Sequence, residues 1–419
     1  ALIDGNNFYA SCEEALNPSL IGRPLIILSN NDGCVIARNA EARRLGISMG
    51  TPYFKVRHSI KRWDIEVRSS NYALYGDMSQ RLMSLIKTDC EELEIYSIDE
   101  AFVKIDRPKE KSLQTWARQL RARIYQNLGL PIAIGIGKNK SQAKLANHLA
   151  KTIINHAGVL DLEAIKEQGI YLEKVAIEDV WGVGKKLAQL FQEKGIKNAR
   201  QLRDMPSNEL NVLYGIVGIR LQSELKGITC LPLSNKHKPK KETCVSRSFS
   251  KPITRLDDLR QAIATYAVRA SKKLREQEQY AGSITVFTRT SPYRSNFYSQ
   301  SATKVLNLHS NDTSIILQNS LELTNRIFKP NRLLIKAGVI MKDLITNDHM
   351  QLHLLETQTP NESLKRERLM HVIDNLNQRY GADAIKWAVC GDNPNGKMDR
   401  KYLSLASTTR LQDIPIVKS

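Results

Sequence analysis

The sequence lacks the features of a membrane protein, a zinc-binding protein or a disulfide scaffold. No apolar run among its 419 residues approaches the roughly 20 residues that a membrane-spanning helix needs. We also expect no signal peptide before the first apolar strand. The six cysteines show neither CxxC nor CxxxH spacing. We therefore expect the reduced thiols of a cytoplasmic protein, and we expect a few further residues to precede Ala1.

Acidic residues are few for the number of basic ones. The chain has 43 Asp and Glu against 62 Lys and Arg, a formal net charge of +19. Such an excess favours a polyanionic partner, either nucleic acid or a membrane surface. The basic residues are spread through the sequence and are not gathered in one amphipathic helix, which favours nucleic acid. A chain of this length is expected to form about two to four domains.

Two adjacent acids, Asp99 and Glu100, separate two apolar segments of alternating pattern within residues 93–105. This pattern predicts a β-hairpin with acids at its turn. Hairpin turns usually take pairs such as Asn-Gly, because they need a positive φ. Two carboxylates there favour a divalent cation site, since hard cations bind carboxylate oxygens and two metal ions can stabilise phosphoryl transfer. A solvated acidic turn is the alternative.

A third acid, Asp4, ends a short apolar strand at residues 2–4 and precedes a predicted helix. An Asp at this position can simply cap the helix. If the strand lies beside the hairpin, however, Asp4, Asp99 and Glu100 converge on one sheet edge, with the backbone carbonyl of Gly5 nearby. That arrangement would suit two Mg²⁺ ions that hold a triphosphate and activate a hydroxyl for attack.

Glycines precede helices in the predicted helical region at 170–230. Gly182 and Gly184 come just before Lys185, and a looser version of this pattern contains Gly215 and Gly218. Backbone N–H groups of such a turn can hold a phosphate. Paired hairpins of this kind resemble helix–hairpin–helix elements, which bind DNA backbone without reading sequence. The alternative is a helix–turn–helix in which glycine only allows close packing.

Alternating strands and helices over residues 1–165, including a helix at 37–46, predict an α+β domain with helices on one face of a mostly antiparallel sheet. Arg247 and Arg289 lie among hydroxyl residues on two later strands and are expected to bind phosphates along one groove. These strands belong to a second α+β unit, with strands expected at 243–249, 282–290, 301–308 and 333–342 and helices at 256–277 and 312–328.

Three motifs in the first 150 residues resemble those of one enzyme family, in the family's order. Asp4 is followed by Phe-Tyr-Ala-Ser at 8–11, residues 97–101 are Ser-Ile-Asp-Glu-Ala, and residues 135–146 contain Gly-Ile-Gly-Lys-Asn-Lys and then Ala-Lys-Leu-Ala. Together they resemble the Y-family translesion DNA polymerases. The loop at 29–39 and the long tail resemble the UmuC branch, the catalytic subunits of bacterial DNA polymerase V.

This resemblance implies a multidomain α+β fold arranged as a right-hand polymerase. It also implies a template-directed, low-fidelity activity that inserts nucleotides opposite and past damaged bases during SOS mutagenesis. The implied domains are palm and fingers at 1–165 (fingers about 20–78), a helix–hairpin–helix thumb at 166–231, a basic linker at 232–242, a little finger at 243–345 and a tail at 346–419.

The resemblance implies roles for individual residues as well. Asp4, Asp99 and Glu100 match the metal-binding acids, with Gly5 lending its carbonyl to two Mg²⁺ ions, for which Mn²⁺ can substitute. Tyr9 matches the position whose ring stacks under the incoming sugar and excludes a ribose 2′-hydroxyl. Further implied positions are Arg43 and Lys151 for binding the triphosphate, and Cys34 and Ile36 for the roof over the nascent base pair.

One position departs from the wider family. Many relatives have a Tyr three residues before Arg43 that contacts the phosphates, whereas this chain has Ala40, as the UmuC branch generally does. Small or flexible residues at 31–34 would leave room above the base pair. A loose roof cannot reject a misshapen pair, because discrimination needs a repulsive wall. Low fidelity and tolerance of damaged templates are therefore expected.

The tail carries partner predictions beyond primer–template DNA and deoxynucleoside triphosphates, with no membrane partner expected. Gln351, Leu352, Leu354 and Leu355 resemble the short motif that binds the bacterial sliding clamp, with Leu355 in place of the usual Phe. A chance amphipathic stretch is the alternative. The segment at 387–416 resembles the tail of the UmuC branch, which implies contacts with a UmuD′ dimer and a RecA filament.

Other classes of protein also use paired acids. A nucleotide cyclase shares a palm-like sheet with two metals but needs no basic second half. A DNA-binding scaffold that has lost catalysis would tolerate loss of an acid, and a two-metal nuclease would not need a triphosphate site or Tyr9. Within the family, a stand-alone enzyme of the DinB type would lack the loop at 29–39 and the long tail.

Overall fold

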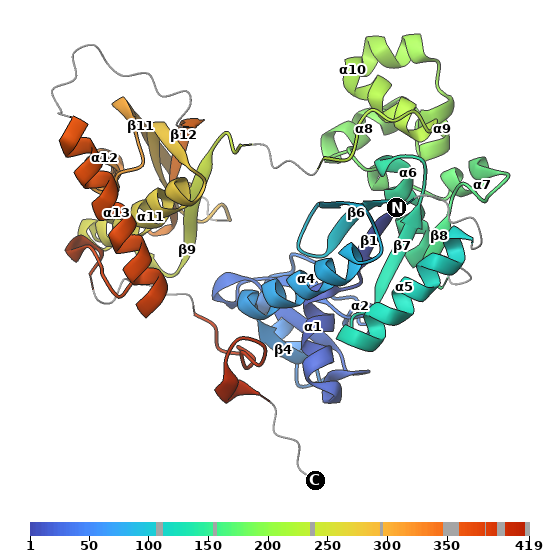
Figure 1. The fold of residues 1–419 in the computed structure, drawn as a ribbon, viewed down its shortest axis with the longest axis horizontal. Helices are drawn as coiled ribbons and strands as arrows, with labels where there is room; N and C mark the ends of the chain where they lie inside the picture. The colour runs from blue at the N-terminus through green and yellow to red at the C-terminus, as the bar shows by residue number, and fades with distance from the viewer. Residues whose placement is uncertain are drawn as a thin grey trace. The chain divides into compact units, whose positions relative to one another are not determined.

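The computed structural model describes residues 1–105, 112–153, 157–234, 239–293, 296–346, 360–381, 383–391 and 399–414. The chain forms two units: Ala1–His237 together with Lys401–Ser419, and Lys238–Arg400. Figure 1 shows the helices and strands of both units. Among the described helices, none is long and apolar enough to cross a membrane.

The first unit is built on a five-stranded sheet with the strand order β5-β6-β1-β7-β8. Strand β1 is central and runs antiparallel to both β6 and β7, while β7 is parallel to β8. The predicted hairpin is confirmed, because β5 and β6 pair antiparallel around the acidic turn. The strands are β1 (Leu2–Gly5), β5 (Glu92–Ile95), β6 (Glu100–Lys104), β7 (Ile132–Ile136) and β8 (Val159–Asp161).

Helices cover both faces of this sheet, so the prediction of a single covered face is wrong. Ile3 and Val103 share one apolar core with residues of three helices on the first face. Leu2 and Phe102 point to the other face and pack with Ala143 of α6 (Lys140–Thr152). The alternation of side chains along a strand separates the two sets. The first-face helices are α1 (Phe8–Leu16), α4 (Tyr72–Lys87) and α5 (Leu113–Leu128).

Helix α6 approaches β7 so closely that only glycine fits between them. A Cβ on Gly135 would lie 2.1 Å from the backbone nitrogen of Asn147 and 2.2 Å from the carbonyl oxygen of Ala143. Asn147 Nδ2 also donates to the Ala133 carbonyl at 2.9 Å. The Gly-Ile-Gly motif therefore sets the distance between this helix and the sheet.

A three-stranded sheet, β3-β2-β4, lies in the same unit. Residues 37 and 38 belong to β3 and not to a helix, because β3 pairs with β2 through Ala37 and Arg38; only 40–44 are helical. The elements are η1 (Pro18–Leu20), β2 (Leu25–Leu28), η2 (Asn30–Asp32), β3 (Val35–Arg38), α2 (Ala40–Arg44), α3 (Tyr53–Val56), η3 (Arg57–Ser59) and β4 (Glu66–Ser69).

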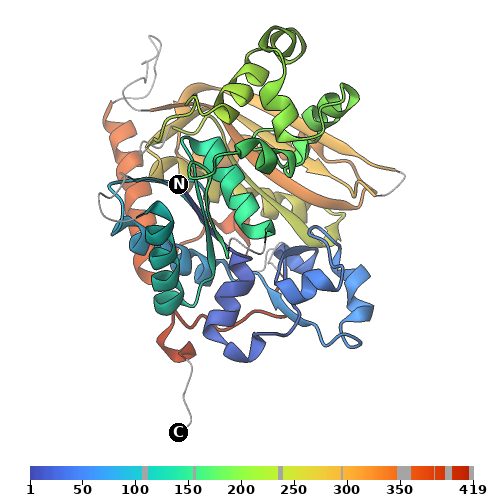
Figure 2. The same cartoon turned by 90° about the vertical axis from the view of Figure 1, so that its right-hand side faces the viewer.

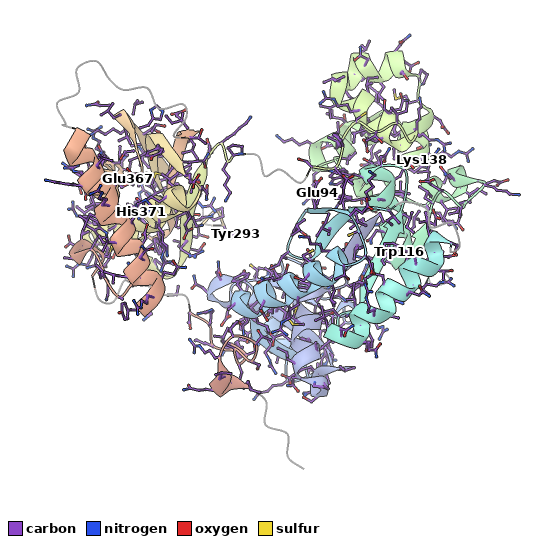
Figure 3. The ribbon with its side chains drawn as sticks, viewed as in Figure 1. Glu94, Trp116, Lys138, Tyr293, Glu367 and His371 are labelled. Atoms are coloured by element: carbon purple, nitrogen blue, oxygen red, sulfur yellow. The ribbon has the colours of Figure 1, made fainter. Side chains whose placement is uncertain are left out.

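Residues 168–225 are helical, as predicted, and α6 joins them to the sheet. Asn139 Nδ2 donates to the carbonyl of Glu224 at 2.8 Å. Lys140 Nζ contacts both carboxylate oxygens of Glu94 on β5, at 2.7 and 2.6 Å; Glu94 and the neighbouring Lys138 are labelled in Figure 3. The helices are α7 (Gln168–Glu173), η5 (Ile177–Asp179), α8 (Lys185–Glu193), α9 (Ala199–Asp204) and α10 (Ser207–Leu225).

The second unit contains an antiparallel sheet with the order β11-β10-β12-β9 and two helices in its core, close to the predicted elements. A third helix, α13 (Pro360–Tyr380), was not predicted. The remaining elements are β9 (Thr243–Ile253), α11 (Leu256–Glu276), β10 (Gln279–Arg289), β11 (Ser299–Ser310), α12 (Thr313–Ile327), β12 (Leu334–Thr346) and η7 (Ala388–Cys390).

The end of the chain belongs to the first unit. Residues 401–414, which include η8 (Leu411–Asp413), run beside β4, where Leu403 forms a parallel bridge with Ser69. Figure 1 shows this segment in red near β4, and Figure 2 shows it from a second direction.

Candidate active site

The β1–β6 pairing brings the predicted acids together. Asp4 on β1 is directly opposite Glu100 on β6. The next residue, Gly5, donates its backbone N–H to the carbonyl of Asp99 at 2.9 Å. The strand at residues 2–4 therefore lies beside the hairpin, which is the arrangement that the acidic site requires.

A serine organises the acidic turn. Ser97 Oγ donates to Asp99 Oδ1 at 2.6 Å and accepts the backbone N–H of Glu100 at 3.1 Å. The backbone N–H of Ser97 donates in turn to the Glu100 carbonyl. The Ser97 hydroxyl therefore stabilises the turn by local hydrogen bonds, although the turn lacks an Asn-Gly pair. It also holds the Asp99 carboxylate in a fixed orientation.

Two lysines of α6 balance the charges of the acids. Lys151 Nζ lies 2.6 Å from Asp4 Oδ1, and Lys144 Nζ lies 2.9 and 3.0 Å from the two carboxylate oxygens of Glu100. Lys144 and Lys151 are two helical turns apart and therefore share a face of α6. Lys144 also lies over the ring of Tyr96, at 4.6 Å from its centroid. Sequence reasoning missed Lys144 as a site residue, although it lies within the Ala-Lys-Leu-Ala motif.

Burial raises the pKa of Asp4 to about 6, and the charge of Lys151 opposes this shift. The neighbouring Glu100 carboxyl raises the pKa of Asp4 further, because a nearby negative charge disfavours ionisation of Asp4. Asp4 therefore takes up a proton at a higher pH than an exposed Asp would.

The donors at this site suit a hard divalent cation, since they are carboxylate oxygens and the Gly5 carbonyl. Among the described residues, however, no three Asp, Glu, His or Cys side chains are gathered as a group that could hold a metal ion. Asp4 and Glu100 contact lysines instead. The residues thus fit the chemistry of Mg²⁺ but are not in a metal-binding arrangement.

Tyr9 on α1 lies beside the acidic turn in a group of tyrosines. Its ring stacks on that of Tyr75 at a centroid distance of 4.4 Å and an interplanar angle of 15°, and it meets the edge of Tyr72 at 6.2 Å. Burial raises the pKa of Tyr9, and the charges of Tyr72 and then Asp99 raise it further. Tyr9 is therefore held from behind by a fully buried ring and has Asp99 as a neighbour.

Of the predicted roof residues, Cys34 immediately precedes β3 and Ile36 lies on it, and the predicted triphosphate residue Arg43 follows on α2. Val35 and Ala37 are buried, so Cys34, Ile36 and Arg38 share the other, half-buried side of the strand. Arg43 is exposed on α2. Burial lowers the pKa of Arg38, and the nearby charge of Arg43 lowers it further. Sequence reasoning missed Arg38. The available signal was its position two residues after Ile36, which places both side chains on the same side of a strand.

The predicted DNA-backbone residues are divided between the two units. Gly182 has a φ of 94°, and Gly184 is the N-cap of α8, whose first residue is Lys185. The second predicted glycine pattern lies inside α10, which kinks at Gly215 with φ 59°. A glycine therefore gives the backbone a conformation that other residues rarely adopt at both places.

The prediction that Arg247 and Arg289 line one groove is wrong. Arg247 pairs with the buried Ala337 and lies near Tyr266 of α11, on the helix-covered side of the sheet. Arg289 pairs with Lys336, the next residue along β12, and therefore lies on the opposite side. A one-residue difference in register reverses the face of a side chain. Gln351, Leu352, Leu354 and Leu355 lie outside the described residues.

Comparisons with known proteins find relatives that match this chain over its whole length. The sequence profile of the impB/mucB/samB family matches residues 3–148, its C-terminal domain profile matches 240–354, and a domain of unknown function matches 367–417. The chain is 38% identical over 422 residues to Protein UmuC of Salmonella typhimurium, covering 100% of both chains. It is 27% identical to DNA polymerase IV of Bacillus velezensis, covering 92% of this chain and 91% of the relative.

Solved structures confirm the predicted α+β polymerase fold. A Y-family DNA polymerase chimera of Dbh and Dpo4 is similar with a TM-score of 0.66 at 23% identity, covering 83% of this chain and 99% of the chimera. An insertion ternary complex of Dbh DNA polymerase is similar with a TM-score of 0.53 at 21% identity, with the same coverage. The chain therefore belongs to the impB/mucB/samB family, the UmuC-type branch of the Y-family DNA polymerases.

Proposed function

We propose that Asp4, Asp99 and Glu100 form the catalytic centre of a template-directed, low-fidelity DNA polymerase that inserts nucleotides opposite and past damaged bases. The observation that carries the proposal is the register that puts Asp4 opposite Glu100, with Gly5 bonded to Asp99. Full-length similarity to UmuC and to DNA polymerase IV supports the same activity.

The acids and the Gly5 carbonyl would hold divalent ions, Mg²⁺ first, with Mn²⁺ as a substitute. When bound, two such ions supply the charge that stabilises the attacking and leaving oxygens of nucleotidyl transfer. Without them, Lys151 and Lys144 neutralise Asp4 and Glu100. The lysines thus prevent the mutual repulsion of two adjacent carboxylates from destabilising the sheet.

Lys151 and Arg43 are proposed to bind the triphosphate of the incoming nucleotide. Lys151 is a cation beside the acidic centre, and Arg43 is an exposed cation on α2. Arginine suits this role because its guanidinium can form two parallel hydrogen bonds to phosphate oxygens. Cys34 and Ile36 are proposed to form the roof over the nascent base pair. The small or flexible residues at 31–34 would leave room above that pair, which supports low fidelity.

Tyr9 is proposed to select deoxyribose. Its ring is held from behind by Tyr75, so it cannot retreat from a sugar placed against its free face. A 2′-hydroxyl would then meet a fixed aromatic ring, whereas a 2′-hydrogen would not. The proposed mechanism of discrimination is steric and needs no hydrogen bond.

DNA binding is proposed to use the α8 N-terminus and the second unit. The backbone N–H groups of the first turn of α8, which begins after Gly184, and the side chain of Lys185 suit a phosphate. Arg289 and Lys336 are cross-strand partners on the side of the second sheet opposite α11 and α12, and they suit further phosphates.

The remaining proposals concern domains and partners. By family resemblance, residues 1–165 are palm and fingers, 166–231 the thumb and 243–345 the little finger. The motif at 351–355 is proposed to bind the sliding clamp, and the tail is proposed to contact a UmuD′ dimer and a RecA filament. The support for each is the sequence resemblance alone.

Primer extension past one abasic site tests the central proposal. Wild type is compared with Asp99→Ala and Glu100→Ala in Mg²⁺, with and without sliding clamp, UmuD′ and RecA. Glu92→Ala is the matched control, because this acid lies on the same hairpin, is only half-buried and pairs with Lys104. Both site variants should abolish extension while the control retains it. DNA binding without extension under every condition would support the scaffold alternative.

A further inference from the structure

The end of the chain is attached to the edge of β4 by backbone and side-chain hydrogen bonds. The backbone N–H of Ser69 donates to the Tyr402 carbonyl at 2.9 Å, and the Tyr402 N–H donates to Ser69 Oγ at 3.0 Å. Ser69 is 0% exposed. The segment therefore covers a strand edge that would otherwise present unpaired backbone groups.

The same segment holds the loop before β3. Lys401 donates its backbone N–H to Asp32 Oδ2 at 2.9 Å, and Ser69 Oγ donates to Asp32 Oδ1 at 2.7 Å. Asn31 and Asp32 have φ values of 58° and 49°, a conformation that residues other than glycine rarely adopt. Asn and Asp tolerate this conformation better than other residues with a side chain, and the two hydrogen bonds to Asp32 hold the loop in place here.

A hydrogen-bonded chain continues from this segment to Tyr9. Ser404 Oγ donates to Glu13 Oε1 at 2.9 Å, and the hydroxyl of Tyr75 donates to the same oxygen at 2.8 Å. Glu13 is only 3% exposed. The Tyr75 ring stacks on Tyr9 at 4.4 Å. Ser404 is thus connected to the sugar-selecting ring through one buried carboxylate and one buried tyrosine.

Asn71 connects Ser404 to the start of α4. Its Nδ2 donates to Ser404 Oγ at 3.0 Å, and its Oδ1 accepts the backbone N–H of Leu74, capping α4. Tyr75 is on that helix, one turn from the cap. Ser404 therefore contacts both the start of α4 and the carboxylate that orients Tyr75.

We propose that residues 401–404 form a strap that sets the position of Tyr9, with Ser404 and Glu13 as positioning residues for sugar discrimination. This inference rests on the proposed role of Tyr9. It assigns a task to part of the C-terminal segment that matches a domain of unknown function. If the strap only covers a strand edge, its loss lowers stability but leaves the choice of sugar unchanged.

The test measures discrimination in the full-length chain, as the ratio of kcat/KM for a deoxynucleotide to that for the matching ribonucleotide. Ser404→Ala and Tyr75→Phe each remove one hydroxyl that donates to Glu13. Each is expected to lower the ratio by about three- to tenfold, the effect of one lost buried hydrogen bond, mainly through a lower ribonucleotide KM. Ser404→Thr keeps a hydroxyl and should restore the ratio.

Two further variants make the outcome decisive. Leu405→Ala is the matched control, because its side chain is 62% exposed on the same segment; it should leave the ratio unchanged. Tyr9→Ala tests the role on which the strap depends. If Tyr9→Ala lowers the ratio but Ser404→Ala and Tyr75→Phe do not, the strap inference is overturned and the sugar role stands. If Tyr9→Ala leaves the ratio unchanged, both fail.

Discussion

Lys151 Nζ lies 2.6 Å from Asp4 Oδ1, so helix α6 supplies a counter-charge to an acid on the central strand β1. The helix can do this because Gly135 lets it approach the sheet closely. The same helix face carries Lys144 to Glu100. The acids of β1 and β6 and the cations of α6 thus form one electrostatic unit.

Lys151→Met should raise the pKa of Asp4 above its present value of about 6, because the lysine is the main influence that lowers it. The acid limb of the pH profile of kcat/KM should therefore move to higher pH. Loss of a charged contact should also lower kcat/KM at neutral pH by about 10- to 100-fold. Lys87→Met, at the exposed end of α4, is the control. An unmoved acid limb would contradict this assignment.

Apparent Mg²⁺ affinity should fall as the pH is lowered through about 6. The sign follows from competition: the raised pKa means that Asp4 binds a proton below this pH, and a neutral carboxyl is a poor ligand. For one competing proton, the loss should approach about tenfold per pH unit below the pKa. The measurement is the Mg²⁺ concentration for half-maximal extension between pH 5 and 7.5. A constant value over that range would contradict the prediction.

Gly135→Ala should disrupt the contact between β7 and α6. The new Cβ would lie 2.1 Å from a backbone nitrogen, which cannot move without shifting the helix. We expect a loss of more than about 3 kcal/mol in the free energy of unfolding. Gly76→Ala is the matched control: its Cβ would meet nothing within 4 Å, and it lies inside α4. That change should stabilise by about 0.5–1 kcal/mol. Denaturant unfolding of both variants provides the measurement.

Asp374→Ala should release α13 from the second unit. Arg275 donates to both carboxylate oxygens of Asp374, at 2.6 and 2.9 Å, and its side chain is only 7% exposed. Removing the acid leaves the buried guanidinium without its carboxylate partner, with the Asn311 carbonyl and the Thr313 hydroxyl as neutral acceptors. The uncompensated charge should cost about 3–5 kcal/mol. Asp257→Ala, an exposed acid on α11, should change stability little. Equal unfolding midpoints for the two variants would count against this prediction.

The parts of the fold that were predicted correctly are those in which local pattern and tertiary pairing agree. Apolar and polar residues alternate clearly along the β5–β6 hairpin, so the sequence predicts it. The two acids then lie at its turn, at one end of the sheet. Helix α13 was missed because its described side chains are mostly exposed, with Met370 as its buried anchor. Residues 37 and 38 were assigned to a helix because periodicity alone does not show that β2 is available for pairing.

The parts of the site that were missed are contacts between distant segments. Glu13 looks like an ordinary polar residue of α1, and Ser404 lies 391 residues away. No spacing rule connects them, because their contact depends on the path of the whole chain. Arg247 and Arg289 show the converse: both were identified as basic strand residues, but their faces depend on register, which the sequence pattern did not determine.

Arg38→Gln tests a residue that the sequence reasoning missed and the structure identifies. Arg38 shares a strand face with Ile36, its charge is close to that of Arg43, and its Nε is buried without a hydrogen-bond partner among the described residues. A buried donor of this kind is satisfied when a phosphate oxygen arrives. We therefore expect the KM for the incoming nucleotide to rise by about tenfold, with kcat less affected. Arg44→Gln is the control, because Arg44 is exposed and pairs with Glu41. If both variants have the same KM, Arg38 does not bind the triphosphate, and its buried nitrogen has only a packing role.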